Sequence, residues 1–171
     1  DSEYNQIRSD ILTNYGKFPT DAVKRVEELL SEYASKLTLR QSLRLNYTKA
    51  YFLIESEQYQ RAYQALTVCK TLADKVNDPG LTYYYYGYLA GMQADLENFE
   101  LSIEAYLAAL NYAQQTDDQA MIARAHNNVG HLLIQMQQFG KALPYIEYFY
   151  QYGQQADNQS YIATALNNLG E

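Results

Sequence analysis

The chain of 171 residues is long enough for one ordinary domain, and 47% hydrophobic with 19% charged residues is typical of a folded rather than a disordered protein. The formal net charge of −7, without any dense run of Lys and Arg, argues against a nucleic-acid partner. No apolar stretch approaches the roughly 20 residues that span a bilayer. We therefore expect no membrane insertion and a protein or peptide as the partner.

Residues 1–40 resemble the rest of the chain only weakly. The stretch NYGKFPTDAVKRVEELLSEYA holds an aromatic residue, a turn proline and Ala22 in the register that later segments share. We expect 1–40 to form a degenerate first repeat or a pair of capping helices.

From residue 41 onward the chain repeats itself with a period of forty residues. The stretch ARAHNNVG at 123–130 returns as ATALNNLG at 163–170, and several independent columns agree with this spacing, which chance rarely produces. The predicted units are 41–80, 81–120, 121–160 and a truncated first helix at 161–171. The columns are Ala50, Ala90, Gly130 and Gly170; Ala22, Ala62, Ser102 and Ala142; Tyr59, Phe99 and Phe139; and the polar pairs Asn77-Asp78, Asp117-Asp118 and Asp157-Asn158.

Each complete unit is predicted to hold two helices. In 121–160, apolar residues recur three and four positions apart on both sides of Gln137-Gln138, and a turn this short forces antiparallel packing. The polar pairs then supply loop residues and helix N-caps. Pro144 falls near the start of a second helix, where we expect at most a mild kink.

The small-residue columns have a steric reason, because two helices approach closely only where one of them carries little side chain. Glycine inside a helix costs about 1 kcal/mol relative to alanine, so Gly130 and Gly170 are predicted to be packing positions. The aromatic column would fill the volume beside each contact. Cys69 occupies a small-residue position and is expected to be buried and inert.

These columns resemble the tetratricopeptide repeat, in the form of about forty residues found in bacterial signalling and regulatory proteins. The resemblance covers about residues 41–171 and departs from the pattern at Cys69 and Phe149. It implies an all-α fold, a right-handed superhelical α-solenoid of antiparallel helix pairs whose first helices line a concave groove. The residues that carry it are Leu89-Ala90, Val129-Gly130 and Leu169-Gly170 in first helices, and Tyr59 with Ala62, Phe99 with Ser102, and Phe139 with Ala142 in second helices.

The resemblance also implies which residues face that groove and bind a peptide or protein. They are Arg44, Tyr47, Tyr51, Tyr84, Tyr88, Arg124, Asn127, Asn128, His131, Asn167 and Asn168. Asparagine carries donors and an acceptor that match a peptide backbone, but the same side chains could fasten neighbouring helices, and both interpretations stay open. Tyr84 and Tyr88, next to Gly87 and Gly91, could wall a pocket for an apolar or aromatic side chain or could simply fill a loose core.

The sequence shows no catalytic or metal-binding motif. His126 and His131 are separated by about 140° around a helix, so they cannot share one metal ion. A glycine-rich phosphate loop, a nucleophile elbow and a Cys/His cluster are all lacking. Arg44 and Arg124 could belong to a carboxylate clamp of the kind that some relatives use for chaperone C-termini, but the helix between them supplies only tyrosine and glycine. We expect no enzyme and no cofactor.

Three functions are compatible with these features. The first is a module that binds a peptide or protein segment in the groove. The second is the sensory or regulatory part of a larger bacterial signalling protein, such as a histidine kinase, diguanylate cyclase or transcriptional regulator, because 169–171 falls in the middle of an expected first helix. The third is a scaffold that self-associates through exposed repeat ends. A cytoplasmic and an exported, periplasmic location are both allowed.

Overall fold

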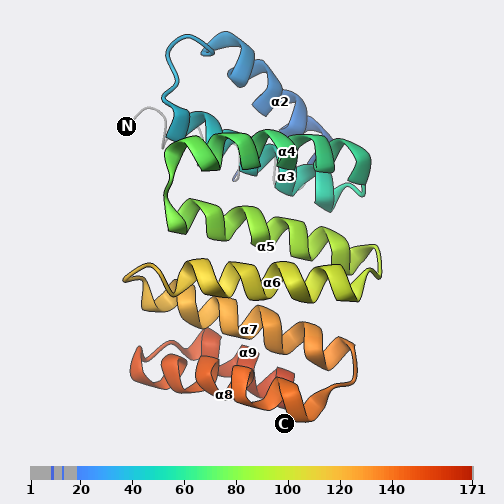
Figure 1. Ribbon diagram of the computed structural model, residues 1–171, viewed down its shortest axis with the longest axis vertical. Helices are drawn as coiled ribbons and strands as arrows, with labels where there is room; N and C mark the ends of the chain where they lie inside the picture. Colours follow the sequence, from blue (N-terminus) through green and yellow to red (C-terminus); the bar gives the residue numbers. More distant parts are fainter. Residues whose placement is uncertain (1–8, 10–12, 14–18, 171) are drawn as a thin grey trace. The chain divides into compact units, whose positions relative to one another are not determined.

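The computed structural model describes residues 9, 13 and 19–170, and every regular element in this part of the chain is a helix (Figure 1). The predicted all-α, solenoid-like succession of helices is confirmed. The helices are α2 (Pro19–Glu32), α3 (Leu39–Glu55), α4 (Tyr59–Val76), α5 (Pro79–Asp95), α6 (Phe99–Ala113), α7 (Gln119–Gln135), α8 (Phe139–Gln155) and α9 (Gln159–Leu169).

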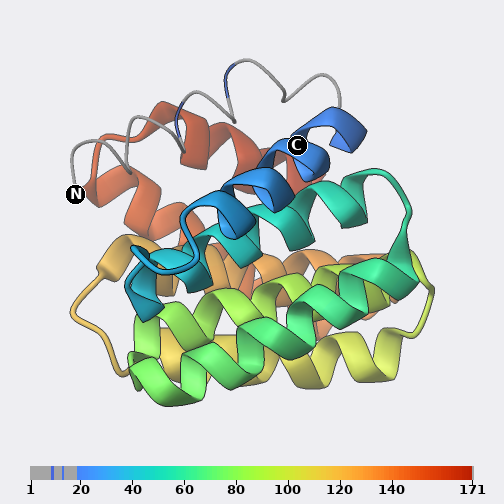
Figure 2. The same ribbon diagram turned by 90° about the horizontal axis from the view of Figure 1, so that it is seen from above.

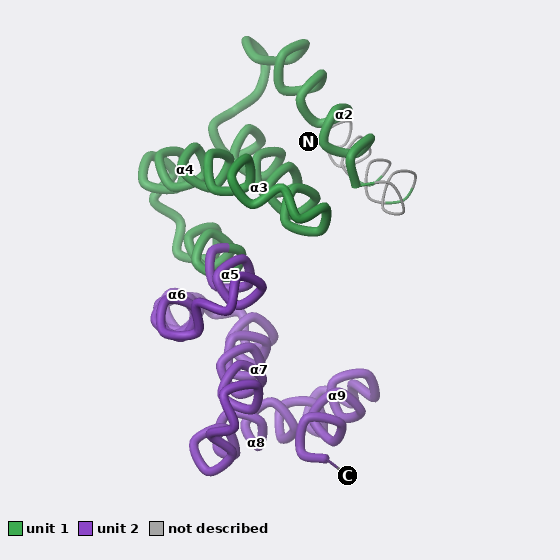
Figure 3. The backbone as a smooth tube through the Cα atoms, turned by 90° about the vertical axis from the view of Figure 1, so that its right-hand side faces the viewer, with its two compact units in different colours: residues 1–88 green, residues 89–171 purple. Residues whose placement is uncertain are grey.

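The chain forms two compact units, residues 1–88 and 89–171, and α5 runs across the boundary (Figure 3). In the first unit, α2 lies against α3 and α3 against α4 (Figures 1 and 2). In the second unit, α6 packs on α7, α7 on α8, and α8 on α9. Within each unit, these consecutive helices are therefore neighbours in space.

Helix boundaries reproduce the forty-residue period. The first helix of each pair begins at Leu39, Pro79, Gln119 or Gln159, two residues before the expected unit starts at 41, 81, 121 and 161. The second helices begin at Tyr59, Phe99 and Phe139, again forty residues apart. Of the degenerate segment predicted at 1–40, α2 and the start of α3 are described, whereas 1–8, 10–12 and 14–18 lie outside the described residues.

The first helix of every pair starts with a side-chain N-cap, as the polar pairs predict. In each case the side-chain oxygen accepts a hydrogen bond from the backbone N–H three residues later, which would otherwise lack a partner. The bonds run from Gln41 to Thr38 (3.2 Å), from Leu81 to Asp78 (3.0 Å), from Met121 to Asp118 (2.8 Å) and from Tyr161 to Asn158 (3.1 Å).

The turn inside each pair is a Schellman motif at the predicted place. Glu57, Glu97 and Gln137 adopt φ values of 57°, 58° and 57°, the left-handed region that glycine normally occupies. In the last of these turns the Gln138 N–H donates to the Leu133 carbonyl at 2.8 Å, which satisfies the end of α7 and reverses the chain into α8. The same bond recurs forty and eighty residues earlier.

The small-residue columns are buried at every position except Gly170, which agrees with a role in close packing. Ala50, Ala62 and Ala90 have no exposed surface. Ser102 is also fully buried, and its hydroxyl donates to the Ala90 carbonyl at 2.8 Å. At Gly130, an added Cβ would meet side-chain atoms of α8 well inside van der Waals contact. These positions set how closely the helices approach.

Two expectations need correction. Gly170 is exposed, with φ of +81°, because α9 ends at Leu169 and Gly170 forms its left-handed C-cap rather than a packing position. Phe139 does not fill a core volume, since 62% of its surface is exposed. Pro144 lies five residues after the first residue of α8, and the helix continues past it to Gln155.

Each unit has a core of its own. In the first, Leu43 and Tyr47 of α3 pack with Cys69 and Ala73 of α4 and with Leu81 of α5. Burial raises the pKa of the Cys69 thiol to about 12, so this thiol is buried and unreactive as expected. The core of the second unit is built from Ala123, Ile146, Phe149 and Ala165.

Candidate functional site

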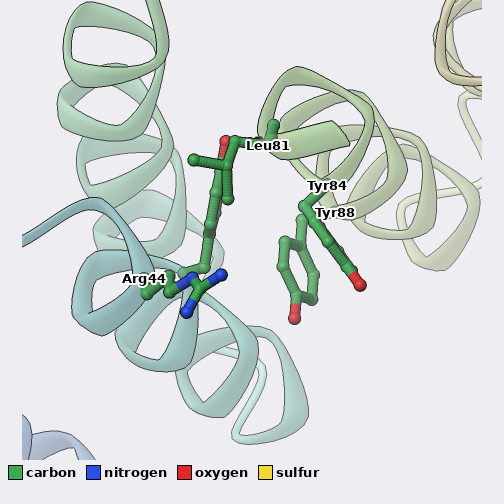
Figure 4. Close-up of a pocket in the computed structure, with 5 residues that line it drawn as sticks. Arg44, Leu81, Tyr84 and Tyr88 are labelled. Atoms are coloured by element: carbon green, nitrogen blue, oxygen red, sulfur yellow. Dashed lines mark hydrogen bonds between the residues drawn. The ribbon is translucent and has the colours of Figure 1, made fainter. Parts of the chain in front are cut away.

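A cavity of about 230 Å³ lies between α3 and α5 in the first unit (Figure 4). We call it the α3/α5 cavity. It is lined by Arg44 and Tyr47 of α3 and by Leu81, Tyr84 and Tyr88 of α5. Residues three or four positions apart lie on one face of a helix, so the lining residues of each helix face the same cavity. Four of the five lining residues belong to the set predicted from the sequence.

Tyr47 forms a fixed wall of this cavity. Only 4% of its surface is exposed, and its hydroxyl donates to the Leu81 carbonyl at 2.7 Å. Its ring lies 5.7 Å from that of Tyr88 and 6.3 Å from that of Tyr84, between centroids. Burial raises the pKa of Tyr47 far above its ordinary value. The Tyr47 hydroxyl therefore joins α3 to α5, and its role in binding a ligand stays a prediction.

Arg44 supplies a cationic group to the cavity. Its side chain is exposed, and its guanidinium has no hydrogen-bond or ion-pair partner among the described residues. By contrast, Arg40 on the same helix pairs with Asp78 at 2.8 Å. Across the opening, the rings of Tyr84 and Tyr88 project from α5 toward the side that carries the guanidinium (Figure 4).

Tyr51 and two glycines lie outside the cavity lining. The Tyr51 ring packs edge-on against Phe52, with 5.1 Å between centroids, and lies 6.4 Å from the Tyr88 ring, so it borders the site. Burial raises the pKa of the Tyr51 phenol, with a smaller contribution from nearby Glu55. Neither Gly87 nor Gly91 is among the residues that line the cavity.

Candidate residues of the second unit fasten helices to one another. The Asn168 amide donates to the Asn127 side-chain oxygen at 2.9 Å, which links α9 to α7. Arg124 donates to the Tyr161 hydroxyl at 3.0 Å and links the same two helices. One member of each asparagine pair, Asn127 and Asn168, thus forms a hydrogen bond between α7 and α9.

The other candidates in this unit remain unbonded within the described part of the chain. Asn128, His131 and Asn167 show no side-chain hydrogen bond there, and His131 and Asn167 are exposed. They are the members of the predicted set in this unit that stay available to a ligand.

Two features escape sequence reasoning. Leu81 lines the α3/α5 cavity because the N-cap at Asp78 fixes where α5 starts. The repeat pattern does not mark Leu81 as a residue of the groove. His126 stacks on Tyr148 with ring centroids 3.9 Å apart, and its buried Nδ1 has no hydrogen-bond partner in the described structure. Burial lowers the pKa of His126 below its ordinary value.

Within the described residues, no group of three or more His, Cys, Asp or Glu side chains is placed to hold a metal ion. Nor does any described helix combine the length and the apolar character needed to cross a bilayer.

The fold and the site together define an all-α protein of repeated antiparallel helix pairs with a small cavity between two successive first helices. No protein-family model matches the chain. A comparison with curated proteins finds no match either. The resemblance to the tetratricopeptide repeat therefore stays a prediction that rests on the residue columns.

Proposed function

We propose that this protein is a non-enzymatic interaction module that binds an extended segment of a peptide or protein, with one side chain of that segment seated in the α3/α5 cavity. The observation that carries the proposal is the guanidinium of Arg44, which has no partner among the described residues, beside the rings of Tyr84 and Tyr88. Arginine and tyrosine are the residue types most enriched at the energetic centres of protein interfaces.

The size and chemistry of the cavity favour a single side chain over a whole small molecule. Its volume of about 230 Å³ lies below the roughly 300–1,000 Å³ of ordinary small-molecule pockets. The tyrosine rings offer apolar surface, and the guanidinium can stack on a ring or bind an acceptor in a bidentate manner. An aromatic or apolar side chain followed by a hydrogen-bond acceptor would satisfy both parts.

Selection from a displayed library of random peptides tests this proposal. The native protein should enrich a shared motif with an aromatic or apolar anchor, and Arg44→Ala combined with Tyr84→Ala should lose that motif. Tyr63→Ala is the matched control, because Tyr63 is a 59% exposed tyrosine on α4 outside the cavity. Equal enrichment by the native protein and the double variant, or loss of the motif in the control, would contradict the proposal.

Self-association is a second candidate, favoured by an exposed apolar surface on α8. Phe139 and Leu143 are 62% and 44% exposed, and together with Ile146 and Leu169 they border a cavity of about 300 Å³. A second copy could cover this surface. The mass in solution should then rise with concentration for the native chain and not for Phe139→Glu; a native chain that stays monomeric throughout would exclude the scaffold. The regulatory role expected from the resemblance rests on sequence alone.

A further inference from the structure

A second and larger cavity lies within the second unit, on the side where α6 and α8 flank α7. Its volume of about 480 Å³ falls in the range of roughly 300–1,000 Å³ that small-molecule pockets occupy. Ile103 and Leu107 of α6 face Val129, Leu133 and Met136 of α7 across it. Val129 is fully buried, whereas Leu107 is 42% exposed, so the lining runs from the core to an open edge. We call this space the α6/α7/α8 cavity.

A single positive charge stands at the edge of this aliphatic lining. Lys141 of α8 is exposed, and its ammonium donates to the Gln138 side-chain oxygen at 2.9 Å. Among the described residues it forms no ion pair, unlike Lys70, whose ammonium lies 2.6 Å from the Asp74 carboxylate. Because its protein partner is a neutral amide, the ammonium of Lys141 keeps its full charge at the edge of the cavity and can pair with an anion.

The forty-residue repeat can hold polar residues at some of the positions that line the α6/α7/α8 cavity. Forty residues before Leu107 the chain has Thr67, and forty residues after it has Glu147. The position of Leu133 is Gln in one unit and Leu in another, at residues 93 and 53. Since the other units place polar residues at the position of Leu107, the repeat does not explain this partly exposed leucine. The exposed Leu107 is a particular property of this unit.

We propose that the α6/α7/α8 cavity binds a small amphipathic anion, an unbranched aliphatic chain that ends in a carboxylate. The chain would lie between Leu107 and Leu133, and the carboxylate would pair with the Lys141 ammonium. Removal of the aliphatic chain from water drives binding, and the ammonium orients it. This site shares no residue with the α3/α5 cavity and does not rest on the proposed function.

Methionine methyl NMR can test the proposal directly. The sequence has three methionines, Met92, Met121 and Met136, and among them only Met136 lines the cavity. In protein labelled with ¹³C at the methionine methyl groups, decanoate should shift the Met136 signal in a saturable way while Met92 and Met121 serve as internal controls. Affinity should rise by about fourfold per methylene from hexanoate to decanoate.

Two variants taken from the repeat itself provide matched tests. Leu107→Thr installs the residue found at position 67, and Lys141→Leu installs the one found at position 101, so each should keep its helix. Leu107→Thr should weaken decanoate binding by about threefold or more. Lys141→Leu should reduce the preference for decanoate over decanol by about threefold. Circular dichroism checks that both variants remain helical.

Each alternative outcome overturns a defined part of the proposal. A Met136 signal that never saturates, or equal shifts at all three methionines, would remove the site. Unchanged affinity in Leu107→Thr would place the ligand elsewhere. An undiminished preference for decanoate in Lys141→Leu would remove the anionic component and leave a cavity that takes any aliphatic chain.

Discussion

Gly130 lies where α7 meets α8 so closely that a methyl group has no room. A Cβ there would lie 2.5 Å from the Ile146 Cδ1, 2.8 Å from its Cγ1 and 3.2 Å from the Tyr145 Cβ. Ile146 is fully buried, and its side chain must shift to admit the added methyl group. We expect Gly130→Ala to lower the free energy of unfolding by about 1–3 kcal/mol, measured by urea denaturation.

Two further variants separate this steric effect from the general effect of replacing glycine in a helix. Gly140 is an exposed helical glycine with no atom near its missing Cβ, so Gly140→Ala should stabilise the protein by about 0.5–1 kcal/mol. Ile146→Val removes the closest methyl group and should recover part of the loss in Gly130→Ala. If Gly130→Ala were as stable as the native protein, the close helix contact would be refuted.

His126 makes stability depend on pH. Burial against Tyr145 and Tyr148 of α8 holds its pKa below the ordinary 6.5, so in this range the unfolded chain binds more protons than the folded one. The free energy of unfolding should therefore fall as pH drops through 6.5, until the pH lies below the folded-state pKa. Urea denaturation from about pH 7.5 to about pH 5.5 measures this decline.

A phenylalanine at this position provides the control for the pH effect. His126→Phe keeps an aromatic ring against Tyr148 and removes both the titrating group and the unpaired Nδ1. This variant should lose less stability than the native protein on acidification. His131→Gln, which changes the other histidine of the chain at an exposed position, should keep the native decline. A native-like decline in His126→Phe would assign the dependence to other groups.

At the scale of the helix and its turn, a left-handed residue ends three first helices. Gln137 occupies φ of 57° at the turn between α7 and α8, where a residue with a side chain is disfavoured by about 1–2 kcal/mol. A glycine at this position removes that cost, but it also raises the conformational entropy of the unfolded chain. Gln137→Gly should thus raise the free energy of unfolding by about 0.5–1 kcal/mol.

The same substitution two residues earlier should have the opposite sign. Gln135 is exposed and right-handed in the last turn of α7, so Gln135→Gly should destabilise the protein by about 0.5–1 kcal/mol. Thermal unfolding of both variants side by side gives the comparison. Equal losses in the two variants would show that the turn at Gln137 is not left-handed in solution.

The elements show why the sequence predicts some features and not others. The N-cap at Asp118 and the turn at Gln137 depend on residues close in the chain, so the forty-residue pattern predicts both. Phe139 occupies a regular column and Tyr47 a predicted groove position, but whether they face a ligand, a neighbouring helix or solvent depends on packing across helices. Sequence reasoning therefore named four of the five residues that line the α3/α5 cavity, but it could not predict the hydrogen bond of Tyr47 to α5.

At the scale of the whole molecule, two separate cores predict localised responses to mutation. Phe149 is 3% exposed in the core of the second unit, and Phe149→Ala should cost about 3–5 kcal/mol there. In a chain of stacked repeats each element is stabilised by its neighbours. Amide hydrogen exchange should therefore accelerate in α7, α8 and α9 and change little in α3 and α4.

A mutation in the other core reverses the expected pattern. Leu43 is fully buried in the first unit, so Leu43→Ala should accelerate exchange in α3 and α4 and leave α8 and α9 nearly unchanged. Uniform acceleration over all helices in both variants would instead indicate one cooperative molecule without separate cores.

The N-caps at residues 38, 78, 118 and 158 also make the chain modular at the level of its gene. A hydroxyl, two carboxylates and an amide cap these four helices in the same way. The helix that follows one of these N-caps could therefore equally follow another. Copying the segment 119–158 and inserting it after residue 158 would add one complete pair of helices and keep every later residue in phase. An insertion of a single residue inside α7 would shift all of its contacts by about 100° around the helix. Tandem duplication is thus an accessible route by which such a chain lengthens, whereas gradual lengthening within a helix is not.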